Sequence, residues 1–160
     1  MHGIELYSYG SEGVDDDGWG CVYRSFQNAM SHTGYKVIPF MGLLEATGYE
    51  WKEWSEQSDF VNIGKTVTFW TGGRAGLFRQ THQSEYAFHI PLKDVNAYIQ
   101  DHKNCAFVVD NGVSGYAIVP FEGRLYWVDP HTHHPRRTLF TTQLLKSKGW
   151  MILQLLPRHM

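Results

Sequence analysis

The stretch that decides the fold is residues 18–34, which read Gly-Trp-Gly-Cys-Val-Tyr-Arg-Ser-Phe-Gln-Asn-Ala-Met-Ser-His-Thr-Gly. Its apolar side chains recur at the spacing of one helix face, at Val22, Phe26, Ala29 and Met30. The glycines at positions 18 and 20 free the chain before this helix, and Gly34 can end it. The pattern therefore predicts a buried helix over residues 21–33, with Cys21 in its first turn.

The last third of the chain has the pattern of β-strands. Four apolar runs are bounded by turn residues, at 105–109, 115–121, 124–129 and 150–156. Glu122 and Gly123 join two of these runs like a tight hairpin. A helix early in the chain and a sheet at its end predict an α+β domain, in which the helix packs against an antiparallel sheet.

Elsewhere the periodicity is weaker, and the predictions are coarser. They are a short strand over 4–9, a loop over 11–20, one or two helices within 40–58, strand character at 67–70 and 85–90, a loop over 72–83, and a short helix over 92–102.

Composition bounds the class of protein. The 160 residues are 42% hydrophobic and 19% charged, which fits a single domain over residues 1–160 and argues against disorder. A net charge of −2 argues against a strongly basic nucleic-acid binder, and two cysteines exclude a disulfide-dense scaffold. No apolar run approaches the ~20 residues that cross a bilayer, and no leader peptide is visible. We expect no membrane segment and a cytoplasmic or nuclear location.

Cys21 is the first candidate for chemistry. The start of a helix carries unpaired N–H groups and the positive end of the helix dipole, which favour a thiolate over a thiol. Such a thiolate is a nucleophile, and the N–H of the same residue could help to hold an oxyanion. The alternative is that Cys21 is only a small buried apolar side chain. Cys105 opens an apolar run without preceding glycines, so we predict that it is structural.

Asp129 and His131 form the second candidate. Alternate residues of a strand face the same side, so the two side chains should project together. Pro130 between them has no N–H and indicates a strand end or edge. A carboxylate beside an imidazole fixes its tautomer and raises its basicity, which would complete a Cys-His-Asp set. The alternative is an ordinary turn after a strand.

His131, His133 and His134 also allow a metal hypothesis, because three histidines can hold a catalytic zinc ion. Their spacing matches no closed zinc site and no cysteine pair accompanies them, so we predict neither a native metal nor a cofactor. The acidic run at 15–17 predicts a hydrated loop, or alternatively a collar that contacts a basic substrate tail. Tyr9 is noted because a tyrosine hydroxyl near a thiolate can donate to an oxyanion.

Together these residues resemble a known family. Residues 18–27 resemble the nucleophile motif of the UfSP peptidases, Gly-Trp-Gly-Cys-x-Tyr-Arg-Ser-x-Gln, which act on ubiquitin-fold modifier 1. Asp129-Pro-His131 resembles that family's Asp-Pro-His box, and Tyr9 stands at its tyrosine twelve residues before the cysteine. The resemblance covers residues 4–34 and 105–157. It leaves out roughly 40–100, where such enzymes build their substrate-binding surface.

The residues after the box depart from the family pattern. Thr132 and His133 stand where the family usually has an aromatic residue. Asp-Pro-His-Thr is more similar to the autophagins, cysteine peptidases of ubiquitin-like autophagy modifiers. Autophagins share Gly-Trp-Gly-Cys, but they lack Tyr-Arg-Ser-x-Gln and are much longer. At 160 residues, this chain resembles a catalytic core without a targeting extension.

The resemblance implies a papain-like fold and a thiol protease of a ubiquitin-like-modifier pathway. This hydrolase would cleave after the C-terminal glycine of ubiquitin-fold modifier 1, in a precursor or in conjugates. Cys21 would be the nucleophile, His131 the base, Asp129 the group that orients it, and Tyr9 an oxyanion donor. Trp19 is a candidate wall of a narrow slot for the modifier tail, or it merely packs its loop. The implied partner is the modifier, and we expect a monomer.

Three alternatives stay open. The chain could be a deubiquitinase or an autophagin-like peptidase that acts on another ubiquitin-like modifier. It could be a non-catalytic binder of a ubiquitin-like protein, although such a binder has no need for an intact Cys, His, Asp and Tyr set. It could also be a metal-dependent hydrolase built on the histidines.

Overall fold

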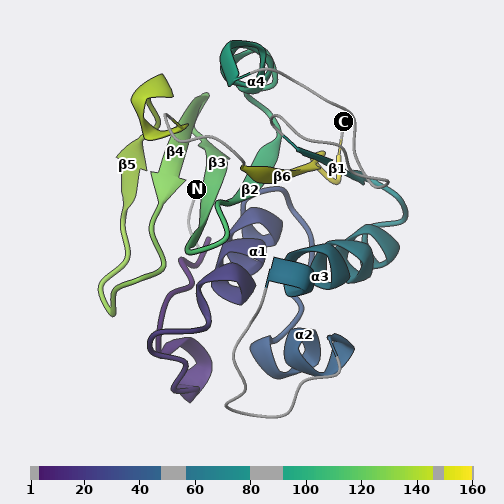
Figure 1. Cartoon of the computed structure of the whole chain (residues 1–160), viewed down its shortest axis with the longest axis vertical. Helices are drawn as coiled ribbons and strands as arrows, with labels where there is room; N and C mark the ends of the chain where they lie inside the picture. The colour runs from purple at the N-terminus through teal and green to yellow at the C-terminus, as the bar shows by residue number, and fades with distance from the viewer. Residues whose placement is uncertain (1–3, 48–56, 80–91, 146–149, 160) are drawn as a thin grey trace.

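The computed structural model of the chain describes residues 4–47, 57–79, 92–145 and 150–159 (Figure 1). Its elements are η1 (Ser11–Gly13), α1 (Cys21–Ser31), α2 (Phe40–Ala46), α3 (Gln57–Trp70), β1 (Ala75–Arg79), α4 (Leu92–Gln100), β2 (Ala106–Asp110), β3 (Gly115–Phe121), β4 (Arg124–Val128), β5 (Arg137–Leu139), η2 (Thr142–Leu145) and β6 (Met151–Leu155).

The strands form one sheet in the order β1-β6-β2-β3-β4-β5, and every neighbouring pair is antiparallel. Helix α1 packs across β2 and β3 at the middle of this sheet (Figure 1). The predicted α+β class, with an early helix on an antiparallel sheet, is confirmed. None of the helices in the described ranges is long and apolar enough to cross a membrane.

The two faces of the sheet bury separate cores, because side chains alternate along each strand. On β2, Ala106 and Val108 join the core beneath α1, α2 and α3. Phe107 and Val109 instead join the core on the opposite face, which α4 and η2 cover (Figure 1). Helix α1 is buried along its first ten residues, polar ones included. Its buried polar side chains therefore need hydrogen-bond partners inside the fold.

The predicted hairpin at Glu122 and Gly123 is confirmed. Both residues have positive φ, 50° and 81°, in the two-residue turn between β3 and β4. This is the backbone that suits the right-handed twist of paired strands. The four predicted strands are β2, β3, β4 and β6, and each lies within one residue of its predicted bounds. Helices over 21–33 and 92–102 were predicted, and the structure has α1 ending at Ser31 and α4 ending at Gln100.

Three predictions were wrong. Residues 67–70 belong to α3, where buried Phe60, Ile63 and Val67 follow helical spacing over a longer window. The predicted loop over 72–83 contains strand β1. This segment is extended because it pairs with the apolar strand β6. Residues 4–9 form no strand, because the backbone at Tyr7 pairs with the amide of the Asn28 side chain, at 2.7 and 2.8 Å.

Strand β5 was not predicted, since its three residues are too few to show a pattern. In the region 40–58, α2 and the start of α3 are helical. The predicted strand at 85–90 lies outside the described residues.

Candidate active site

Cys21 is the first residue of α1, and a tight turn leads into it. The N–H groups of Trp19 and Gly20 both donate to the carbonyl of Asp16, at 3.1 and 3.0 Å. Gly20 cannot carry a side chain, because a Cβ there would lie 1.8 Å from the Asp16 carboxylate. Cys21 is 7% exposed at the end of the turn. The glycines before the cysteine therefore serve close packing as well as backbone freedom.

The start of β3 approaches the thiol from the sheet side. The N–H of Gly115 donates to Sγ of Cys21 at 3.3 Å. A Cβ at Gly115 would lie 3.0 Å from the Cγ2 atom and 3.2 Å from the Cα atom of Val22. Sequence reasoning missed this residue, and a glycine that begins an apolar strand was the only signal for it.

The Asp129 and His131 side chains meet just beyond β4. Nδ1 of His131 lies 2.6 Å from Oδ1 of Asp129, and the backbone N–H of His131 donates to the same oxygen at 2.9 Å. The Cys21 thiol lies close enough to this ring for its negative charge to raise the pKa of His131. The imidazole is therefore bonded to the Asp129 carboxylate and lies near the sulfur of Cys21.

The electrostatics of this site favour a charged imidazole. Burial by itself lowers the pKa of His131, but the hydrogen bond with Asp129 and the negative charges of Cys21 and Asp129 outweigh it, and the pKa rises to about 9. The hydrogen bond from His131 lowers the pKa of Asp129 despite the opposing effect of burial. The site therefore favours an imidazolium beside the Asp129 carboxylate.

Tyr9 lies beside the same histidine. Its N–H donates to the carbonyl of Pro130 at 3.1 Å, and its ring meets His131 edge-on, with centroids 5.5 Å apart. Burial and then the negative charge of Cys21 raise the pKa of Tyr9 above its ordinary 10. Its hydroxyl therefore stays protonated and able to donate a hydrogen bond near the thiol.

Tyr116 packs against His131 on another side. Its ring centroid is 5.1 Å from that of His131, and the ring stacks on Trp127 at 4.6 Å. The imidazole therefore lies in contact with two tyrosine rings. No spacing in the sequence indicated Tyr116, because its place follows from the register between β3 and β4.

Trp19 packs its ring into the loop and helix that flank Cys21. The ring stands edge-on to Phe40 and to Tyr23, with centroids 5.5 and 6.3 Å apart. It is only partly buried against the core. These contacts favour the packing interpretation, and the exposed part of the ring leaves room for the second one, a wall beside the nucleophile.

The hydrated loop predicted at 15–17 was wrong at Asp16. Asp15 and Asp17 are exposed, but Asp16 is fully buried and pairs with Arg24, which is also fully buried, at 3.0 Å. Composition cannot show that the middle aspartate of an acidic run is buried while its two neighbours are exposed. The matching signal was Arg24 itself, a cation on a helix that is otherwise wholly buried.

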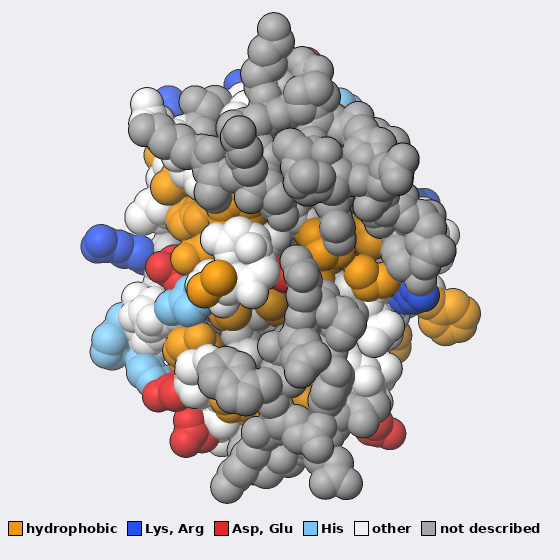
Figure 2. All heavy atoms as spheres, viewed as in Figure 1, with side chains coloured by type: hydrophobic (Ala, Val, Ile, Leu, Met, Phe, Trp, Pro, Cys, Tyr) orange, Lys and Arg blue, Asp and Glu red, His pale blue; other side chains and the backbone are white. Residues whose placement is uncertain are grey.

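The remaining histidines of the cluster have separate contacts. Nε2 of His133 lies 3.0 Å from Oδ2 of Asp17, in a pair that is more than half exposed. His134 is exposed and lines a hollow of about 450 Å³ together with Asp129 and Arg136. In Figure 2, pale-blue histidine side chains gather with acidic ones over the loop that joins β4 to β5. Within the described ranges, no group of three or more His, Cys, Asp or Glu side chains is placed to hold a metal ion.

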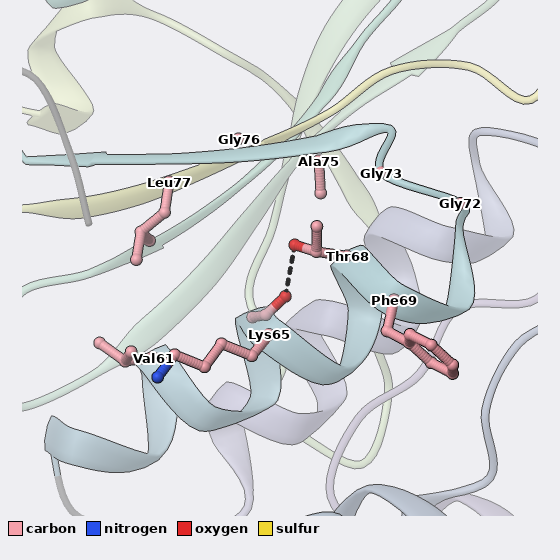
Figure 3. Close-up of a pocket in the computed structure, with 10 residues that line it drawn as sticks. Val61, Lys65, Thr68, Phe69, Gly72, Gly73, Ala75, Gly76 and Leu77 are labelled. Atoms are coloured by element: carbon pink, nitrogen blue, oxygen red, sulfur yellow. Dashed lines mark hydrogen bonds between the residues drawn. The ribbon is translucent and has the colours of Figure 1, made fainter.

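Two further features lie away from this site. Cys105 is 2% exposed, Nε2 of Gln154 donates to its sulfur at 3.4 Å, and burial raises the pKa of its thiol. A hollow of about 880 Å³ lies between α3 and β1, where Ala75 and Leu77 face the side of the helix that carries Thr68 (Figure 3). None of the predicted site residues lines it.

Comparison with known proteins gives one short similarity. No family model matches the chain. A stretch of 27 residues is 59% identical to a protein of Oryza sativa subsp. japonica that is named "Probable Ufm1-specific protease". This stretch is 17% of the chain and 4% of the length of the Oryza sativa protein. The printed name of that protein is that of the peptidases whose motifs residues 18–27 and 129–131 resemble.

Proposed function

We propose that this chain is a thiol-dependent peptidase that cleaves after the C-terminal glycine of ubiquitin-fold modifier 1. The observation that carries the proposal is that His131 bonds to the Asp129 carboxylate and lies near the thiol of Cys21, the first residue of a buried helix. The short similarity to a protein named as a Ufm1-specific protease supports the choice of substrate. The fold would then be papain-like, with the nucleophile on a helix and the base on an antiparallel sheet.

The reaction would begin from a thiolate–imidazolium pair. The sulfur of Cys21 attacks the carbonyl carbon of the terminal glycine, and the C=O electron pair moves to the oxygen. The tetrahedral intermediate then collapses, the C–N bond breaks, and the proton of His131 passes to the leaving amine. Water next attacks the thioester and gives a proton to His131. The C–S bond breaks, which restores the ion pair and releases the modifier as a carboxylic acid that gives its proton to solvent.

Two donors are available for the tetrahedral oxyanion. The protonated hydroxyl of Tyr9 lies close enough to Cys21 for the cysteine's charge to raise its pKa. The N–H of Cys21 is at the start of α1, where helical N–H groups have no partner in the preceding turn. One such donor is worth ~10²–10³ in kcat. The N–H of Gly115 is assigned instead to the sulfur, which it already contacts.

The test is adduct formation with modifiers that carry a C-terminal electrophile. The panel comprises ubiquitin-fold modifier 1, ubiquitin, a NEDD-type modifier, a SUMO and an autophagy modifier, with intact-mass and peptide-mass readout. We expect an adduct on Cys21 with ubiquitin-fold modifier 1, and none with the Cys21→Ala variant. Cys105 serves as an internal control, because it is buried and should stay unmodified in the folded protein.

Other outcomes of this panel overturn the proposal in distinct ways. An adduct with a different modifier alone keeps the peptidase and changes its substrate. Binding without any adduct, measured on folded protein, leaves a non-catalytic binder. Substrate cleavage that resists thiol alkylation and stops with a chelator would favour the metal-dependent alternative.

A further inference from the structure

A buried ion pair joins helix α1, which begins with the proposed nucleophile, to the loop that precedes it. Nε of Arg24 donates to Oδ2 of Asp16 at 3.0 Å, and Nη2 donates to Oδ1 at 3.1 Å, so the pairing is bidentate. Both side chains are fully buried. Burying two charges gains little stability over an apolar pair of the same size. Stability by itself therefore does not explain why these two charged side chains are buried together.

Arg24 connects the nucleophile helix to the loop that carries Tyr9. It lies three residues after Cys21 on α1. Besides Asp16, its Nη2 donates to the carbonyls of Ser11 and Val14, at 2.9 and 3.3 Å. The guanidinium therefore holds the loop at several points between Tyr9 and the start of the helix.

Asp16 makes the matching contacts from the loop side. Its Oδ1 accepts the N–H of Gly10, the residue after Tyr9, at 3.0 Å. Its carbonyl accepts the N–H of Gly20, the residue before Cys21, at 3.0 Å. The Asp16 carboxylate also fills the space that a side chain at Gly20 would need. Asp16 therefore contacts Gly10, the neighbour of Tyr9, and Gly20, the neighbour of Cys21. Tyr9 and Cys21 are the two residues that must act together on the substrate carbonyl.

We propose that Asp16 and Arg24 are positioning residues, which hold the hydroxyl of Tyr9 at its working distance from the sulfur of Cys21. The inference rests on the proposed function. Its physical basis is that a shift of ~1 Å between reacting groups can reduce a rate by ~10²-fold. If the pair were purely structural, breaking it would lower the stability of the fold, and its effect on kcat would not depend on Tyr9.

Asp16→Asn tests this with little change in shape. All three groups that face the carboxylate are donors: the N–H of Gly10, and Nε and Nη2 of Arg24. An amide nitrogen in either position of Asn would oppose a donor, so the loop has to move. Asp101→Asn is the matched control, because the same substitution falls on an exposed side chain just after α4, outside this loop.

The decisive measurement is a double-mutant cycle on kcat with Tyr9→Phe. We expect Asp16→Asn to lower kcat by ~10-fold or more in the wild-type background, with KM within about twofold. In the Tyr9→Phe background it should lower kcat by less than about twofold, since the hydroxyl it positions is already gone. Asp101→Asn should match wild type. Urea unfolding verifies that each variant is folded in the assay.

The outcomes separate this inference from the function on which it rests. Equal factors in the two backgrounds, or a change confined to KM, overturn the positioning role while wild-type turnover stands. Absence of turnover by the wild-type chain overturns the proposed function and the inference with it. If Asp16→Asn does not fold, Arg24→Lys takes its place in the same cycle, because it keeps the charge and loses the bidentate geometry.

Discussion

The N–H of Gly115 donates to the sulfur of Cys21, although 94 residues separate the two in the sequence. The contact exists because β3 begins against the first turn of α1, with no side chain between them. A Cβ at Gly115 would press on the Val22 Cα and Cγ2 atoms. A backbone N–H that donates to a sulfur stabilises negative charge that develops on it.

Gly115→Ala should therefore weaken both the fold and the site. The added methyl group has to push β3 away from α1, which lengthens the N–H···S contact. We expect the free energy of unfolding to fall by about 1–3 kcal/mol and Cys21 to be alkylated more slowly by iodoacetamide. Gly76→Ala is the matched control: nothing lies within 4 Å of its Cβ position, in strand β1. Equal alkylation rates in the two variants would contradict the role of Gly115.

The raised pKa of His131 sets an alkaline limit on activity. The imidazolium must persist to protonate the leaving amine, so kcat/KM should fall as pH rises through about 9. Asp129→Asn removes the carboxylate that helps to raise this pKa, and the alkaline limb should move toward the ordinary histidine value of 6.5. A profile from pH 6 to pH 10.5 for both proteins checks this. An unmoved limb in Asp129→Asn would remove the assignment.

The raised pKa of His131 also makes the free energy of unfolding depend on pH. Because the pKa is raised in the folded protein, the contribution of His131 is complete below about 6.5 and is lost as pH rises through about 9. His131→Ala should therefore flatten the alkaline side of the stability curve as well as abolish turnover.

Tyr9→Phe should lower kcat and leave KM nearly unchanged. The hydroxyl would act on the oxyanion, which exists only after attack, and the loss of one such donor is worth ~10²–10³-fold. Because burial and the charge of Cys21 raise the pKa of Tyr9, the loss should be the same at pH 7 and pH 9. Tyr7→Phe is the matched control from the same segment. A kcat for Tyr9→Phe within twofold of wild type would exclude the oxyanion role.

Trp19→Ala separates packing from substrate contact. Its ring packs against Phe40 and Tyr23, so we expect a loss of about 1–2 kcal/mol in unfolding free energy. If the exposed part also borders the modifier tail, KM should rise in protein that is still folded. Thermal melting and kinetics on the same samples distinguish the two effects. If the loss of stability accounts for all of the lost activity, Trp19 does not form a wall of the slot for the modifier tail.

His32 should make the fold sensitive to acid. Burial lowers its pKa to about 4, and Nε of Arg137 donates to its Nε2 at 3.0 Å, which requires a neutral ring. The unfolded chain binds this proton near pH 6.5, so stability should fall as pH drops from about 6.5 toward 4. Denaturant unfolding at pH 7 and pH 4.5 should show a smaller fall for His32→Gln. His134→Gln, on an exposed side chain, should behave like wild type.

The sequence was informative where a local pattern carries the structure. Helix α1 follows from its apolar spacing, and the β3–β4 hairpin follows from alternating strands around Glu122 and Gly123. The pair of Asp129 and His131 was predictable for the same reason, since only Pro130 lies between them. Residues 67–70 show the limit, because a short apolar run fits a strand and a helix equally well until its longer context is known.

By itself, then, the sequence determined the nucleophile helix, the antiparallel strands and the carboxylate–imidazole pair, all of which depend on near neighbours. Only the tertiary structure decided that Asp16 lies buried against Arg24, that Gly115 reaches the sulfur of Cys21, and that Tyr116 packs on His131. The physical reason is that these contacts depend on strand register and on how closely a helix approaches the sheet. Those quantities are set by packing over the whole core, and no local spacing of residues encodes them.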